Sequence, residues 1–331
     1  MTSSEGKRRG RAAFFWLPVT LLVVAGLLTG GWYFAAHLAR LRGQAIITQL
    51  NAAGKTLDCR NATITGFPIK FGVDCRSVGY EDRKQGISLA SGRTHAVIAL
   101  YSPFRMNVAL NGPASIEAED TRPLALDWEK LDAQLSLGLD DVTGITVEGK
   151  ALAIEKGTKP AVGSVLFQLG AANIAAEPSA GDLDLAFTLS NLTFGPAWPV
   201  LRGLHPIDAT GNIRAFNGAG LLQTGLQSLR NRQFAINALK VEPGPDSSAA
   251  VTGNISFDEN GLADGRLLVA LHDVKALSAI LAQAFPREAS KIEPAFAMLG
   301  ALGNDQTLPV DIRKGRISLG FFKIGRLPPV D

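Results

Sequence analysis

The chain has 331 residues, of which 33 are Lys or Arg and 30 are Asp or Glu, so its formal charge is +3. The first 42 positions hold six of the basic residues and one of the acidic ones, which leaves 27 basic and 29 acidic residues in the remainder. The main part of the chain therefore lacks the basic excess that holds phosphates, and this argues against nucleic acid as a partner. With only 19% charged residues, 35 Gly, 17 Pro and apolar residues in short runs, the composition favours strands and turns.

An uncharged apolar segment near the N-terminus predicts a transmembrane helix over residues 13–38. The run from Phe14 to Leu38 is long enough to cross about 30 Å of hydrocarbon as a helix. Phe14 and Trp16 at one end and Trp32 at the other lie where aromatic rings favour the headgroup level of a bilayer. The chain is therefore expected to contact a membrane as a single-pass protein.

The basic residues around this segment predict its orientation. Lys7, Arg8, Arg9 and Arg11 precede the span, and only two arginines follow it closely. By the positive-inside bias, residues 1–12 form a cytoplasmic tail, the span lies in the inner membrane and the main domain is periplasmic. The alternative is a cleavable signal peptide, but its apolar core would be long and no clean Ala-x-Ala site follows it.

Beyond the span, residues 39–54 are expected to continue as an outward helical stalk. Leu41, Ala45 and Leu50 recur at near-helical spacing, and Gly54 is a plausible C-cap. The remaining residues, 55–331, are then the extracytoplasmic β-rich domain.

The only two cysteines, Cys59 and Cys75, flank alternating apolar residues on either side of a Gly-Phe-Pro centre. In an oxidising compartment they are expected to form a disulfide, which closes a loop of about 15 residues and is worth about 3 kcal/mol in the chain-entropy model. Two buried free thiols are the main alternative. A metal or redox site is disfavoured, because neither a CxxC spacing nor a paired histidine accompanies them.

From about residue 87 onward, short runs with a period of two are separated by Gly, Pro, Asn and Asp, as in an antiparallel meander. The clearest hairpin joins Val251–Phe257 to Leu262–Leu271 through a polar turn that ends in glycine. Helical spacing follows from Val274 to Phe285 and from Ile292 to Leu302. The expected fold is mainly β with a few helices (α+β), a transmembrane helix followed by a curved antiparallel β-meander.

Several motifs occur in a familiar order. They are Gly66-Phe67-Pro68 within a first strand pair, the hairpin from Gly253 to Leu267, the segment Gly315–Gly320 and the final Leu327-Pro328-Pro329. This order resembles the uncharacterised bacterial envelope family catalogued as domain of unknown function 2125, over nearly the whole chain. More distantly, the pattern is similar to AsmA-like proteins. That resemblance implies tethering to the inner membrane and a β-groove of the kind thought to carry phospholipid.

The sequence shows no catalytic, metal-binding or cofactor-binding motif. The four histidines are scattered, and neither a nucleophile elbow nor a phosphate-binding glycine loop occurs. The expected activity is therefore non-enzymatic, with no cofactor and no metal. A hydrolase would need distant residues to converge in a polar cleft.

Two functions fit these observations. The first is the binding of phospholipid or another apolar ligand in an open β-groove near the membrane, with inward residues that are apolar yet uncovered. The alternative is a non-catalytic envelope scaffold, in which edge strands or helices bind another envelope protein and the groove is filled by side chains.

Overall fold

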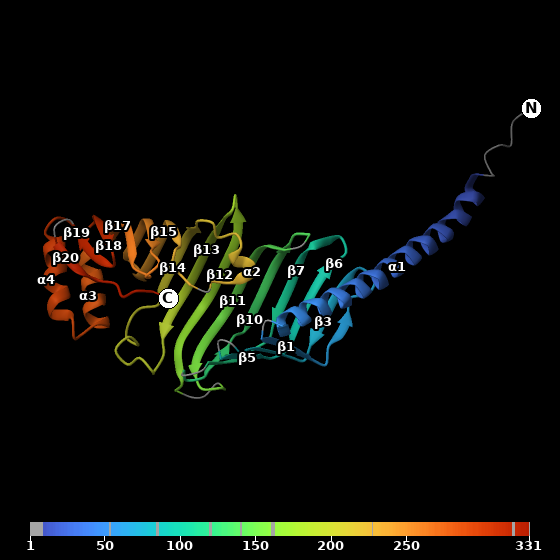
Figure 1. The fold of residues 1–331 in the computed structure, drawn as a ribbon, viewed down its shortest axis with the longest axis horizontal. Coiled ribbons are helices and arrows are strands. Elements are labelled where there is room, and N and C mark those ends of the chain that lie inside the picture. The colour runs from blue at the N-terminus through green and yellow to red at the C-terminus, as the bar shows by residue number, and fades with distance from the viewer. Residues whose placement is uncertain are drawn as a thin grey trace, which may run out of the picture.

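The computed structural model describes residues 9–330 except residues 53, 84–85, 119–120, 140, 160–162, 227 and 320–321. The described chain is mainly β, with 20 strands in one large, open antiparallel sheet and four helices (Figure 1). This agrees with the expectation of a mainly β fold with a few helices.

Helix α1 (Arg9–Ala52) is a single 44-residue helix that projects from one end of the sheet (Figure 1). Within the part of the chain that the structure describes, no helix combines the length and the apolar character needed to cross a bilayer. The side chains of residues 9–17 and most of those of residues 38–50 lie outside the description. Phe14, Trp16 and Leu38 are among them, so the predicted span stays a prediction.

Most strands follow one another in a main ladder, in which each strand is antiparallel to the next. Its members, in spatial order, are β2 (Thr63–Thr65), β3 (Lys70–Cys75), β6 (Thr94–Ala99), β7 (Ser102–Leu110), β10 (Lys130–Leu137), β11 (Val142–Lys156), β12 (Val165–Ser179), β13 (Asp182–Phe194), β14 (Ile207–Ala215), β15 (Gln233–Gly244), β16 (Ser247–Phe257), β17 (Ala263–His272), β18 (Gln306–Arg313), β19 (Arg316–Leu319) and β20 (Phe322–Arg326). From β10 onward the expected meander is confirmed, including the hairpin of β16 and β17.

A short ladder branches from the main ladder at β11. Its members, in spatial order, are β1 (Lys55–Arg60), β4 (Ser77–Asp82), β5 (Ile87–Ser91), β8 (Ala114–Ala118) and β9 (Leu124–Asp127). The strand β9 pairs with the last residues of β11. Between residues 55 and 137 the chain therefore alternates between the two ladders, and the simple meander expected from Ile87 onward is wrong for this part. Alternation of apolar and polar residues reveals a strand but not its partner, so the sequence did not show this arrangement.

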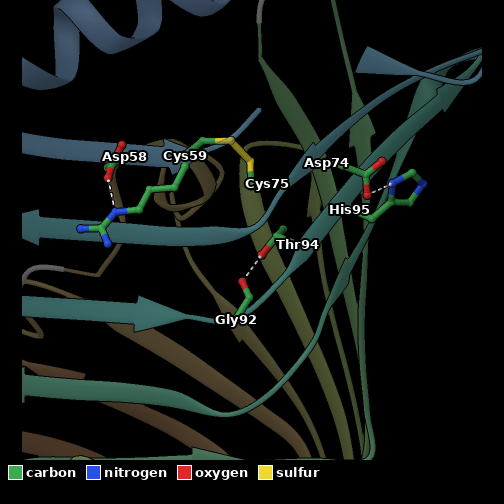
Figure 2. Close-up of a disulfide and its surroundings, with 8 residues drawn as sticks. Asp58, Cys59, Asp74, Cys75, Gly92, Thr94 and His95 are labelled. Carbon is green, nitrogen blue, oxygen red and sulfur yellow. Dashed lines mark hydrogen bonds and ion pairs between the residues drawn. A yellow bond between two sulfur atoms is a disulfide. The ribbon is translucent and has the colours of Figure 1, made fainter. Parts of the chain in front are cut away.

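The disulfide between Cys59 and Cys75 joins these two ladders. Cys59 lies on β1 at the edge of the short ladder, and Cys75 ends β3 of the main ladder, with their Cα atoms 5.3 Å apart (Figure 2). The predicted disulfide is present. Since β11 connects the ladders at one side, the disulfide closes the other side and holds the two layers together.

Three helices lie on or beside the main ladder. The helices α3 (Val274–Ala284) and α4 (Ala289–Gly300) stand at the C-terminal end of the sheet (Figure 1), where Val274 and Leu277 are buried. The Asp273 carboxylate caps α3 by accepting a hydrogen bond from the backbone N–H of Ala276 at 3.0 Å. These two helices confirm the helical spacing seen in the sequence. A single turn, α2 (Leu221–Thr224), meets the start of β11, where Gln223 donates to the backbone oxygen of Val142.

The buried core is small for a chain of this size. Among the described residues, Val274 is the only large side chain with under 2% of its surface exposed. The solvent-accessible surface is 21702 Å², whereas a compact monomer of the same mass would expose about 13,000 Å². Both the projecting helix and the largely single-layered sheet account for the excess.

Breaking the disulfide should destabilise the N-terminal half of the sheet. We expect Cys59→Ser to lower the free energy of unfolding of the full chain by about 3 kcal/mol, because the loop between the cysteines is no longer constrained in the unfolded state. Chemical denaturation checks this. The double variant Cys59→Ser/Cys75→Ser should match the single one, and an unchanged unfolding midpoint would contradict the role assigned to the bond.

Candidate functional site

The strand register places one continuous row of apolar residues across the main ladder. In this row each residue is the direct cross-strand partner of the next, through 13 neighbouring strands from β2 to β18. Its members are Ile64, Val73, Ala96, Val108, Ala133, Val147, Ile174, Phe187, Gly211, Leu239, Val251, Val269 and Leu308. At a strand spacing of about 4.8 Å, the row extends for about 58 Å.

The neighbouring row, shifted by one residue on every strand, is polar or small. It consists of Thr63, Asp74, His95, Ala109, Asp132, Glu148, Asn173, Thr188, Thr210, Lys240, Ala250, Ala270 and Thr307. Successive side chains of a strand point to opposite faces, so through these 13 strands the main ladder has one apolar face and one face of polar or small residues.

The apolar face is incompletely covered. Every member of its central row keeps contact with solvent, and Ile174 is 38% exposed although its strand lies in the middle of the sheet. Gly211 leaves room for a neighbour, because a Cβ atom there would collide with the ring of Phe187. We name this incompletely covered apolar face of the main ladder, from β2 to β18, the trough. An open apolar surface of this length is unusual for a protein that acts alone in water.

The trough is covered at its C-terminal end. There the loop 195–206 and the helices α3 and α4 close over the sheet and leave a cavity of about 310 Å³. Its lining is wholly apolar and includes Phe194, Val241, Leu271, Leu277 and Phe296. A cavity without polar groups is suited to hydrocarbon rather than to water.

At the N-terminal end, the short ladder faces the trough. Cys59 pairs with Val78 on the short ladder, and Cys75 lies on the same face as Val73 of the apolar row. Because the disulfide joins Cys59 to Cys75, the apolar faces of the two ladders are turned toward each other. The trough therefore continues between two layers toward helix α1.

Helix α1 docks on this end through Trp32. The Trp32 ring lies at 5.4 Å from the Phe67 ring and 6.3 Å from the Phe71 ring, and its Nε1–H donates to the backbone oxygen of Lys70 at 2.8 Å. Gly66, Phe67 and Pro68, predicted as a structural motif, thus form the turn that receives Trp32. A β-rich domain beginning at residue 55 folds back along α1 to the level of Trp32, which the sequence pattern did not indicate.

The turn at Gly66 is tight. Gly66 has a φ of +96°, the backbone N–H of Lys70 donates to its carbonyl oxygen at 2.8 Å, and a Cβ atom there would lie 2.8 Å from the oxygen of Lys70. Only glycine meets both requirements at no cost.

The polar face carries solvent-exposed ion pairs. Arg214 donates two hydrogen bonds to Asp184, at 2.7 and 2.9 Å, and these bonds lower the pKa of the Asp184 carboxyl. The Nδ1 atom of His95 lies 3.0 Å from the Oδ1 atom of Asp74 (Figure 2). Exposed pairs of this kind contribute little stability, and they keep this face hydrated.

The depression beside His95 on the polar face, about 470 Å³, is lined by Asp132, Gln134, Thr146 and Glu148 and contains neither Ser nor Cys among its described lining. Within the described part of the chain, no cluster of three or more His, Cys, Asp or Glu residues could hold a metal ion. The described residues at these places thus offer neither a Ser or Cys nucleophile nor a metal site.

Comparison with known proteins gives a family but no activity. The family model described as "Uncharacterized protein conserved in bacteria (DUF2125)" matches residues 32–328, a segment that begins at Trp32. No curated protein and no solved structure matches the chain. The more distant likeness to AsmA-like proteins stays a prediction.

Substitution of Gly66 should lower the free energy of unfolding more than substitution of a glycine that has a similar φ but lies in open space. Gly181 in the β12–β13 turn has a φ of +93°, and a Cβ atom there would meet nothing within 4 Å. Gly181→Ala therefore carries only the backbone cost, about 1–2 kcal/mol. Gly66→Ala adds the collision with Lys70 and should also loosen Trp32. Denaturation midpoints and Trp fluorescence of the two variants check this, and equal losses would contradict the tight turn.

Proposed function

Because the chain belongs to the DUF2125 family of uncharacterised bacterial proteins, whose description carries no activity, we propose from the geometry of this chain alone that it binds lipid acyl chains in the trough. The observation that carries the proposal is the apolar row across 13 strands whose members stay accessible to solvent. A sheet whose apolar face served only as core would be covered by a second layer along its whole length, whereas here the short ladder and the helices α3 and α4 cover its two ends.

Energetics favour an apolar occupant. Each square ångström of apolar surface removed from water is worth about 25 cal/mol, so a hydrocarbon chain lying along the trough gains several kcal/mol without any polar contact. The wholly apolar cavity under α3 and α4 offers space for the end of such a chain. Polar headgroups would remain outside, toward solvent.

We further propose that the protein is a single-pass protein of the inner membrane with a periplasmic β-rich domain. Val19, Leu21, Leu22, Val23 and Leu27 of α1 are all exposed, so apolar side chains surround this helix without a protein partner among the described residues. The disulfide supports an oxidising compartment for the domain. The lipid-binding trough would then lie beside the bilayer that contains its ligand.

A scaffold that binds another envelope protein is the second candidate. It is favoured by Met298 and Leu302 on and beside α4, which are both more than 70% exposed. In that case the binding surface is the outer face of α4 and not the trough.

A pair of adjacent residues on β12 tests the trough directly. Ile174 lies on the apolar face and Asn173 on the polar face, and both are exposed. A photo-crosslinking amino acid, p-benzoyl-phenylalanine, at position 174 of the full chain in its native membrane should yield phospholipid adducts by mass spectrometry. The same group at position 173 should not. Equal yields, or protein adducts alone at position 174, would refute lipid binding in the trough.

A charge introduced at the same two positions gives an independent measurement. Ile174→Asp should reduce the phospholipid that stays bound to the full chain in native mass spectrometry severalfold, because an isolated carboxylate is costly against hydrocarbon. Asn173→Asp adds the same charge on the polar face and should leave the bound lipid unchanged. Should both variants retain lipid equally, the trough is not its binding site.

A further inference from the structure

A cluster of large exposed apolar side chains surrounds the point where α1 meets the sheet. We name this cluster the aromatic edge. Its members are Tyr33, Phe34, Phe67, Ile69, Tyr101 and Phe104. Tyr101 is 78% exposed, Phe34 70% and Phe67 54%, values that are costly for aromatic rings that face only water.

Two hydrogen bonds bring the three parts of the aromatic edge together. Trp32 of α1 is hydrogen-bonded to Lys70, directly beyond Ile69. The backbone N–H of Leu100 donates to the carbonyl oxygen of Ile69 at 3.0 Å, so the β6–β7 turn that carries Tyr101 lies beside the turn that carries Phe67. In Figure 1 the β6 end and α1 lie together at one end of the sheet, and α4 lies at the other.

The charges at this edge are of one sign. Lys70 and Arg105 are exposed on the adjoining polar face, and neither residues 66–72 nor residues 99–106 include an acidic residue. Aromatic rings combined with basic side chains suit the headgroup region of a bilayer with anionic lipids. This combination next to α1 therefore favours a lipid surface over a protein as the partner.

The aromatic edge is also the beginning of the trough. Phe71 contacts Trp32 and is the cross-strand partner of Ile98, whose face is shared with the apolar row. A hydrocarbon chain that leaves a bilayer at Trp32 would therefore meet apolar surface without crossing water.

We propose that the aromatic edge inserts into the headgroup region of the membrane that holds α1, and that it is the point where membrane lipid reaches the trough. The inference rests on the membrane anchoring and lipid binding proposed above. It adds two points. The lipid surface is the partner of the aromatic edge, and the ligand comes from the same bilayer instead of from a soluble carrier.

The test compares the two ends of the sheet in one bilayer. The full chain is reconstituted in nanodiscs of phosphatidylethanolamine and phosphatidylglycerol, with p-benzoyl-phenylalanine at Tyr101 or at Met298. Met298 is the matched control, because it is 72% exposed but lies on α4 at the far end. We expect lipid adducts at position 101 to exceed those at position 298 at least fivefold, and equal yields would overturn the proposal.

A second variant separates this inference from the proposed function. Phe67→Asp/Tyr101→Asp places two carboxylates at the edge and should lower the lipid adduct yield of a crosslinker at position 174 severalfold. An unchanged yield there would overturn the route through the aromatic edge while leaving the trough intact. Conversely, adducts at position 101 without adducts at position 174 would support membrane insertion and refute the trough.

Discussion

The register between neighbouring strands is the constraint on which the other features of this protein depend. Ile174 and Asn173 are adjacent in the chain, yet one belongs to an apolar row through 13 strands and the other to a polar row of the same length. A slip of one residue in any strand would exchange the two faces of that strand. The small covered core means that register, rather than dense packing, gives this sheet its two different faces.

Two contacts then fix the positions of the short ladder and of α1 relative to the main ladder. The disulfide between Cys59 and Cys75 holds the short ladder against the main ladder, so that their apolar faces are opposed. Trp32 attaches α1 to the turn at Gly66, and this places the beginning of the trough beside the helix. At the far end, α3 and α4 cover the sheet over an apolar cavity. The proposed lipid binding and access from the bilayer both follow from this order of open and covered parts.

The candidate site consists of apolar residues, a class that carries no short sequence motif. Val, Ile, Leu, Phe and Ala in alternation are as typical of a filled core as of a ligand-binding trough, and the sequence pattern left both alternatives open. Whether such a side chain belongs to a core or to a ligand-binding surface depends on whether another part of the chain packs against it. For Ile174 nothing in the described chain covers it fully, whereas Leu277 on α3 is buried.

The sequence by itself determined the β-rich class, the β16–β17 hairpin, the helices near 274–300 and the family, because each rests on local alternation, helical spacing or a short motif. It favoured the disulfide but left two free thiols as an alternative. Only the tertiary structure decided which strands pair between residues 55 and 137, how Trp32 meets Phe67, and which part of the apolar face is left uncovered. The physical reason is that alternation assigns a side chain to a face, while its neighbours across strands are chosen by long-range pairing. Whether an apolar residue is core or surface depends on a layer that is distant in the chain.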